Sequence, residues 1–301
     1  MPKSLSSYAG LLTEKQNPRT QTIDLASTPE ILRKIQREDL TVAWSVGKVN
    51  RALARAADCI VERLKNGGRL FFMGAGTSGR LGVMEAAECP PTFDTPPGLI
   101  QALMAGGKRA VFRSREGAED REGEARRQVS SRLKRGDILV GIAASGATPY
   151  VLAGLQSARR KGCPTILITC SPPRNPRRLA ELVIAPRTGP EVIAGSTRMK
   201  AGTATKMILN RLTTAAMIRL GKVYRNTMVD LQPKSRKLRA RAIRLIQLLG
   251  KVRSEKLAQN YLRKARGKTK LAILMARKNL DYAAARKKLQ SVKGFLRLAL
   301  R

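Results

Sequence analysis

Apolar positions between residues 28 and 64 recur with the period of a helix. From residue 42 to residue 64 they return every three or four positions, which predicts one long helix with a single buried face. A shorter helix is expected to begin before it, with Thr28 as its N-cap, because Pro29 suits the first helical turn. Residues 1–25 lack this period and are expected to form an irregular lead-in.

Four short apolar runs then predict buried β-strands, at residues 70–73, 99–104, 138–142 and 165–169. Helical segments separate several of these runs, and the clearest covers residues 149–161. Strands that alternate with helices predict a parallel sheet covered by helices on both faces, which is an α/β fold with three layers, αβα. A further helix with an apolar face is expected at residues 201–220.

After residue 230 the chain changes to basic helices, three of which are expected to start near Ser254, Lys268 and Asp281. The apolar residues between 243 and 249 predict one buried face in the helix before them. Lys and Arg outnumber Asp and Glu by 59 to 21 in the whole chain, a net charge of +38, and by 22 to 2 from Lys234 onward. Clustered cations attract nucleic acids. Because this segment has few aromatic residues and no recognisable nucleic-acid motif, such binding is expected to be only incidental, through the basic surface.

The absence of certain residue types and patterns limits the chemistry and the location that the chain can have. The chain has no histidine, so any proton transfer must use carboxylates, lysine, tyrosine or water. Its four cysteines show no metal-ligand spacing and favour a reducing compartment, the cytoplasm. The longest uncharged stretch, residues 138–158, contains Ser, Gly, Thr and Pro, so no membrane span is expected, and residues 1–20 have no apolar run typical of a signal peptide.

A glycine-rich loop, Gly-Ala-Gly-Thr-Ser-Gly-Arg at residues 74–80, follows the first predicted strand. Its glycines allow tight turns, and a helix that starts here presents free N–H groups to an anion. A second loop, at residues 144–148, also follows a predicted parallel strand and is expected to join it at one sugar-phosphate site at the carboxyl edge of the sheet. A third loop, at residues 195–200, opens another helix and adds two cations and further candidates for phosphate contacts. The candidate ligand-binding residues are Gly76, Thr77, Ser78, Ser145, Thr148, Ser196, Thr197, Arg198 and Lys200, with solvated charge as the alternative for the last two.

Two segments supply carboxylates for acid–base chemistry on a sugar. Glu88 directly precedes Cys-Pro-Pro-Thr, and the two prolines at positions 90 and 91 are predicted to end the helix that carries it. Glu119 belongs to Glu-Gly-Ala-Glu-Asp at residues 116–120, in which Glu116 and Asp120 are interpreted as structural.

The position of Glu88 raises a geometric question. In a helix unbroken from Gly79, its carboxylate would lie about 13 Å along the axis from the phosphate end, farther than a hexose 6-phosphate can reach. Either the helix ends earlier, or Glu88 serves a site across a dimer interface.

These segments, taken together, closely resemble the N-acetylmuramic acid 6-phosphate etherases, bacterial enzymes of the sugar isomerase (SIS) fold. The resemblance extends from residue 13 to at least residue 230 and rests on residues 13–18, 74–80, 88–91, 116–120, 189–191 and 195–203. It implies a flavodoxin-like SIS sheet with a small C-terminal helical domain, and a homodimer. The domains would be an N-terminal lead-in and helix at 1–50, an SIS sugar-phosphate domain at 51–232 and a basic helical domain at 233–301.

The resemblance also implies a reaction. It is the cleavage of the D-lactyl ether of N-acetylmuramic acid 6-phosphate by elimination and then water addition, with no metal or other cofactor. Glu88 and Glu119 match the family's catalytic glutamates. Glu119 is expected to be the base at C2, and Glu88 the acid at C3 and then the base for water, or the reverse. Ala147 and Ala194 stand where the family usually has arginine and threonine, which puts the substrate affinity in question.

Three other interpretations compete with the etherase. A non-catalytic sugar-phosphate regulator of the glucokinase-regulator type would keep the loops but need neither glutamate. A transcription regulator of the SIS type would need an N-terminal helix-turn-helix, whereas the first 50 residues resemble the etherases. The third is a folded scaffold that has lost its activity.

Overall fold

The computed structural model describes residues 10–173 and 175–301, which fall into two compact units. The first unit consists of the described residues up to Ala87 together with Gly98–Thr213. The second unit consists of Glu88–Pro97 together with Thr214–Arg301. The three-part division expected from the sequence stays a prediction. Each unit is described by itself below.

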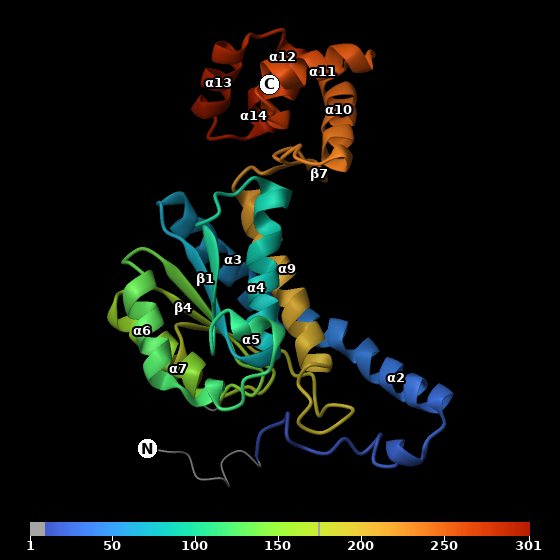
Figure 1. The fold of residues 1–301 in the computed structure, drawn as a ribbon, viewed down its shortest axis with the longest axis vertical. Helices are drawn as coiled ribbons and strands as arrows, with labels where there is room; N and C mark the ends of the chain where they lie inside the picture. The colour runs from blue at the N-terminus through green and yellow to red at the C-terminus, as the bar shows by residue number, and fades with distance from the viewer. Residues whose placement is uncertain (1–9, 174) are drawn as a thin grey trace. The chain divides into compact units, whose positions relative to one another are not determined.

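The first unit is built on a five-stranded parallel sheet, which confirms the predicted α/β fold (Figure 1). Its strands are β1 Leu70–Gly74, β2 Ile100–Met104, β3 Ile138–Ile142, β4 Thr165–Ile168 and β5 Leu182–Ile184. They lie in the order β2-β1-β3-β4-β5. Four of them coincide with the predicted apolar runs. The fifth is a three-residue edge strand within the apolar run at residues 182–185, which was not among the predicted strands.

Successive residues of β1 pack against helices on opposite faces of the sheet. A Cβ added to Gly82, in α4 (Gly76–Phe93), would lie 2.9 Å from the Phe72 Cβ, so this helix packs closely on the Phe72 face. A Cβ added to Gly154, in α7 (Pro149–Arg160), would lie 2.1 Å from the Met73 Sδ on the other face. Figure 1 shows these helices on the two sides of β1, as the predicted three-layer arrangement requires.

The long helix predicted at residues 42–64 is in fact two helices, α2 (Thr28–Gly47) and α3 (Asn50–Lys65). The break follows Gly47, since glycine is a poor helix former, and Val49 has left the helical conformation at φ −103°, ψ 14°. The apolar stripe nevertheless continues across the break, with buried side chains in both helices. The N-cap of α2 is Ser27 rather than Thr28, because Ser27 forms a capping box with Glu30.

The prediction that Pro90 and Pro91 end α4 is wrong, since the helix continues to Phe93. Each proline lacks the N–H that would bond to the carbonyl four residues earlier, but both lie in the last turns, where few helical bonds remain to be lost. The helix stops at Asp94 instead. This residue adopts the left-handed conformation at φ 51° and donates its N–H to the Pro90 carbonyl at 3.0 Å, as a C-terminal cap does.

The remaining helical elements before residue 220 are η1 Ile23–Leu25, α5 Arg109–Phe112, η2 Ala118–Asp120, α6 Glu122–Arg132, α8 Pro176–Leu179 and α9 Lys200–Arg219. The predicted helices at 149–161 and 201–220 correspond to α7 and α9 within one residue at each end. None of the helices among the described residues is long and apolar enough to cross a membrane.

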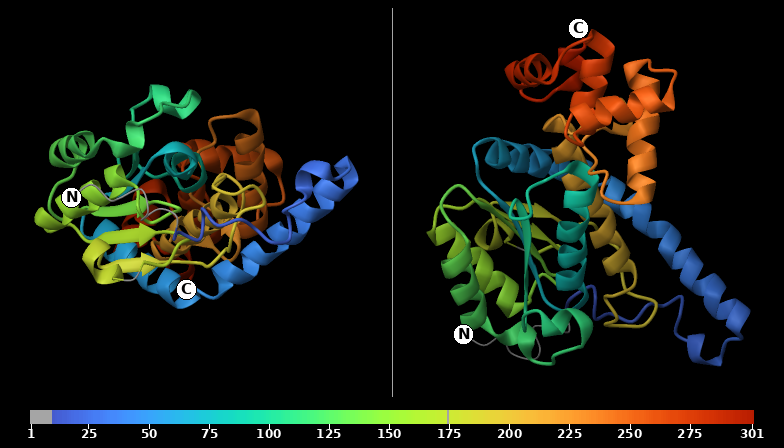
Figure 2. Two further views of the ribbon diagram at one scale, coloured as in Figure 1. Left: turned by 90° about the horizontal axis from the view of Figure 1, so that it is seen from below. Right: turned by 45° about the horizontal axis from the view of Figure 1, so that its top comes forward.

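The second unit is helical, apart from a short hairpin of β6 (Val223–Tyr224) and β7 (Thr227–Met228) that the sequence did not predict. Its helices are α10 Arg236–Gly250, α11 Glu255–Lys264, α12 Thr269–Lys278, α13 Tyr282–Ser291 and α14 Leu296–Ala299 (Figure 2). The three predicted helix starts are confirmed as N-caps of α11, α12 and α13. Leu248 was expected in the buried face of α10 but is 68% exposed, whereas Ile246 is fully buried.

Candidate functional site

A cavity of about 340 Å³ lies at the carboxyl edge of the sheet, lined by the turns after β1, β2 and β3. The strand order reverses between β1 and β3, and the loops there diverge toward opposite faces, which leaves a crevice. The cavity brings together seven of the predicted site residues: Gly76, Thr77, Ser78, Glu119, Ser145, Thr148 and Thr197. We call it the sugar-phosphate cavity.

The turn between β1 and α4 depends on its glycines. Gly76 has φ +52°, a conformation that side-chain-bearing residues rarely adopt. A Cβ on Gly74 would lie 2.6 Å from the Gly79 nitrogen, and one on Gly79 would lie 2.5 Å from the Gly74 oxygen, so the backbone touches itself here. This contact starts α4 directly after the strand. The first N–H groups of the helix, with the Thr77 and Ser78 side chains, thereby line the cavity as an anion-binding end.

The carboxylates of the cavity come from the segment after β2. Gly117, at φ +72°, turns the chain into η2, and Glu119 in that turn lines the cavity with a half-buried side chain. Glu116 also lines the cavity, where its Oε1 accepts a hydrogen bond from Ser114 Oγ at 2.6 Å. The interpretation of Glu116 as structural stays a prediction. Asp120 is exposed and is not a lining residue.

Two arginines and a further glutamate line the cavity without having been predicted. Arg80 donates its Nε to the Val111 carbonyl at 2.8 Å, and Arg115 donates Nη1 to the Gly106 carbonyl at 3.2 Å. Each bond holds one edge of a guanidinium and leaves other N–H groups for an anion. Glu14 comes from the lead-in. Arg80 and Glu14 lie in motif segments 74–80 and 13–18, so the signal was present, but spacing alone did not show which members face inward.

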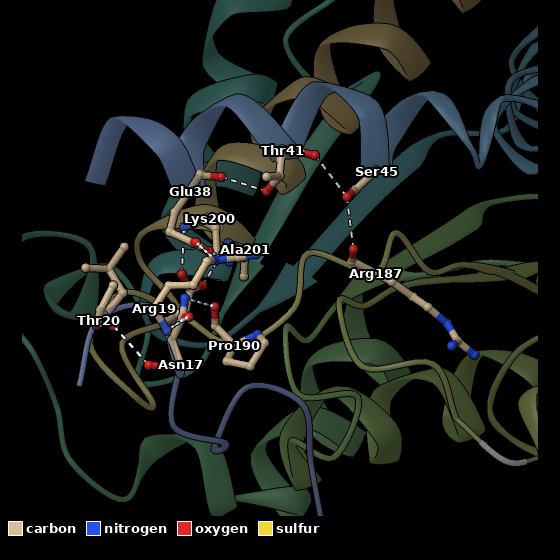
Figure 3. A network of polar contacts seen from close by, with 12 residues as sticks. Asn17, Arg19, Thr20, Glu38, Thr41, Ser45, Arg187, Pro190, Lys200 and Ala201 are labelled. Carbon is tan, nitrogen blue, oxygen red and sulfur yellow. Dashed lines mark hydrogen bonds and ion pairs between the residues drawn. The ribbon is translucent and has the colours of Figure 1, made fainter. Parts of the chain in front are cut away.

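Lys200 was predicted to contact the ligand, and the structure places it elsewhere. Its side chain is fully buried, and Nζ lies 2.5 Å from Glu38 Oε2, while Arg19 Nε lies 2.6 Å from Glu38 Oε1 (Figure 3). A buried carboxylate requires cations close by, which explains where the lysine points. Burial alone would raise the pKa of Glu38, but hydrogen bonds from Arg19 and Lys200 and the Lys200 charge lower it to about 2. The alternative of a solvated charge is equally wrong for Lys200.

The loop before α9 is fixed by Glu191, whose role was not predicted. Its two carboxylate oxygens accept the backbone N–H groups of Lys200 and Ala201, each at 2.9 Å, and so cap the helix. Burial raises the pKa of Glu191. The lead-in holds the same loop from outside. Asn17 Nδ2 donates to the Pro190 carbonyl at 3.3 Å (Figure 3). Thr20 Oγ1 donates to the Val192 carbonyl at 2.8 Å.

Three more predicted residues do not line the sugar-phosphate cavity. Ser196 and Arg198 belong to the loop before α9 but are not lining residues, although their neighbour Thr197 is. Glu88 is exposed on α4 and is not a lining residue either. Because α4 continues past it without a break, the alternative in which the helix ends earlier no longer holds.

Comparison with known proteins places this geometry in a family. Residues 52–159 match the N-terminal SIS domain of glucokinase regulatory proteins, and residues 119–215 match the SIS domain. A solved phosphoheptose isomerase from Francisella tularensis shares the fold, with a TM-score of 0.50 and 18% identity, over 64% of this chain and all of that one. These matches confirm the predicted SIS fold.

Two relatives match at much higher identity. The N-acetylmuramic acid 6-phosphate etherase of Symbiobacterium thermophilum is 52% identical over 265 residues, which is 88% of each chain. That of Salmonella agona is 47% identical over 292 residues, or 96% of this chain and 98% of that one. The chain therefore belongs to the N-acetylmuramic acid 6-phosphate etherase family.

Proposed function

We propose that this chain cleaves the D-lactyl ether of N-acetylmuramic acid 6-phosphate and releases N-acetylglucosamine 6-phosphate and D-lactate. One observation supports this most directly. A single cavity joins the anion-binding start of α4 to the carboxylate of Glu119, so a sugar held by its phosphate would meet an acid–base group. The family to which the chain belongs has this activity in its name.

The mechanism follows from the open-chain sugar. Its aldehyde at C1 acidifies the C2 proton, which Glu119 removes as a general base. An acid then protonates the lactate oxygen as the C3–O bond breaks, and water adds to the unsaturated aldehyde at C3. We assign Glu88 as this acid and as the base for water, with the reverse order as the alternative. Thr77, Ser78 and Arg80 would hold the phosphate, because all three line the cavity at the start of α4.

We further propose that the enzyme is a homodimer and that Glu88 acts in the site of the second copy. On α2, Leu32, Leu40 and Trp44 are 60%, 67% and 77% exposed. Their spacing in multiples of four residues forms an apolar stripe, as expected for a surface that another chain covers. Within one copy, Glu88 is nine residues beyond Gly79 in a continuous helix, about 13 Å along its axis.

A mixing experiment tests this shared site. Glu88→Gln and the pair Thr77→Val with Ser78→Ala are each expected to be inactive alone. After dissociation and reassociation together, they should recover about a quarter of the wild-type activity, since half of the dimers are mixed and each mixed dimer has one intact site. No recovery, with mixed dimers shown to form, would mean that one chain supplies each site.

The reaction itself is tested by incubating the full chain with N-acetylmuramic acid 6-phosphate and assaying D-lactate with a coupled dehydrogenase. Release of D-lactate at many turnovers per chain is the expected result. The match of residues 52–159 to glucokinase regulatory proteins favours a sugar-phosphate regulator as the second candidate. That function predicts binding of the same compound, measured by calorimetry, with no lactate formed.

For its other partners, we propose that the chain works in the cytoplasm on a small sugar phosphate and binds nucleic acid only incidentally. The support is that the +38 charge is shared about equally between the two units and that the basic second unit carries no recognisable nucleic-acid motif.

A further inference from the structure

The second unit contains a larger cavity, of about 860 Å³, that the proposed reaction does not use. It is bounded by the start of α12, by α13 and by the segment that leads into α10. At its base, Lys270 is 7% exposed, and its Nζ donates to the carbonyls of Gly221 at 2.9 Å and Gly294 at 3.1 Å. The same Nζ lies 2.6 Å from Asp230 Oδ2. We call this the helical-unit cavity.

The charges that line this cavity do not balance. Seven cations face two carboxylates, and both carboxylates are already engaged. Asp230 pairs with Lys270 and, at 3.4 Å, with Lys222, while Asp94 accepts a hydrogen bond from Gln232. A further cation, Arg266, stacks on the Tyr282 ring with 4.6 Å from its carbon to the ring centre. Within residues 10–173 and 175–301, the other four cations form no hydrogen bond or ion pair through their side chains: Lys234, Lys268, Arg286 and Lys293.

The number of lining cations alone does not separate this cavity from the rest of the basic second unit. A cavity of the same volume, about 860 Å³, lies between α10 and α11 of the same unit. It is lined by only three cations, Arg239, Lys256 and Arg263. Like charges gathered around one concave space repel one another, and low-dielectric walls focus their field on an anion that enters. Cations make up a similar share of both linings, three of ten residues against seven of twenty, so the helical-unit cavity is distinguished by its buried cation, Lys270, at the base.

The volume and the apolar part of the lining define the class of ligand. The cavity is more than twice as large as the sugar-phosphate cavity and lies within the range of sites for small organic molecules. Leu220, Leu231, Leu289 and Tyr282 provide apolar surface between the cations. We propose that it binds a phosphorylated small molecule that carries at least three negative charges and an apolar or aromatic portion. An extended nucleic acid is less suited, since Lys270 at the base is only 7% exposed.

ATP without divalent cations is a suitable probe, measured by calorimetry on the full chain at physiological ionic strength. Saturating N-acetylglucosamine 6-phosphate keeps the sugar-phosphate cavity occupied. Arg286→Gln with Lys293→Gln is expected to weaken ATP binding at least about tenfold, because each side chain makes a charge-assisted hydrogen bond in the complex. Both residues are exposed and make no side-chain bonds, so folding should persist, which thermal melts will verify.

The matched control is Arg244→Gln with Lys287→Gln, which removes the same charge from exposed positions on α10 and α13 outside the cavity. Its affinity for ATP should stay within about threefold of wild type, as expected for screened surface charges. Equal weakening by both pairs would overturn the proposal in favour of diffuse attraction. No ATP binding by the wild-type chain would also overturn it. The proposal would also be overturned if the Arg286 and Lys293 substitutions weakened the binding of an oligonucleotide but not that of ATP.

Discussion

Glutamine in place of Glu119 is expected to lower kcat by about 10²- to 10⁴-fold, the usual contribution of a general base. The substitution keeps the size of the side chain and its position in η2 but removes the carboxylate that we propose takes the C2 proton. KM should change little, since the phosphate-binding turn at the start of α4 is untouched. Exchange of the C2 hydrogen in deuterated water, followed by NMR, should disappear together with lactate release.

Two variants make this result specific. Asp120→Asn changes the next residue, which is exposed and does not line the cavity, and should leave kcat within about twofold, as is usual for surface positions. Glu88→Gln should block lactate release yet retain C2 exchange if Glu88 is the acid at C3. Normal exchange and turnover by Glu119→Gln would reject its role as the base.

Replacing Glu38 by glutamine is expected to lower the free energy of unfolding by about 3–5 kcal/mol, the typical effect of removing one partner from a buried ion pair. The loss would leave the Lys200 ammonium, which is fully buried, without its ion-pair partner. Urea denaturation measures the change. Glu62→Gln is the matched control, because Glu62 is 61% exposed and lies 3.6 Å from Arg63, so less than about 1 kcal/mol should be lost. An equally small effect of both substitutions would contradict this role of the pair.

The same pair gives stability a dependence on pH. The pKa of Glu38 is about 2 in the folded protein, below its ordinary value of 4.5. A lowered pKa stabilises the fold fully above the unfolded value, and this stabilisation disappears as pH falls from about 4.5 toward 2. Glu38→Gln should therefore show a flatter stability profile than wild type across that interval.

The sheet was the part of the fold that the sequence predicted best. Buried parallel strands consist of continuous apolar residues, so β1, β3 and β4 were evident from local composition. Local composition did not show the break after Gly47 or the continuation of α4 past two prolines. Each depends on the balance between a local preference and packing against distant residues. Propensity disfavours proline in a helix but does not prohibit it in a final turn.

The site was predicted in part for a similar reason. Thr77, Ser145 and Glu119 follow strands that end at one edge of the sheet, so topology alone brings them together. Lys200 lies at the start of α9, but its side chain points toward the buried carboxylate of Glu38, to which Nζ donates a hydrogen bond. Glu38 is 162 residues away in the sequence. No local pattern encodes that partner.

The bonds between the lead-in and the loop before α9 also affect the order of folding. Thr20 reaches the Val192 carbonyl across 172 residues of chain, and Asn17 reaches that of Pro190 across 173. On the ribosome, the lead-in emerges first, yet it must wait for most of the sheet to be synthesised before it can dock. Contacts between residues so far apart in the sequence form slowly, because the chain loses the entropy of loop closure before the contacts stabilise it. The lead-in is therefore made early but is among the last segments to reach its native place, and the sugar-phosphate cavity, which Glu14 of the lead-in lines, is complete only after that step.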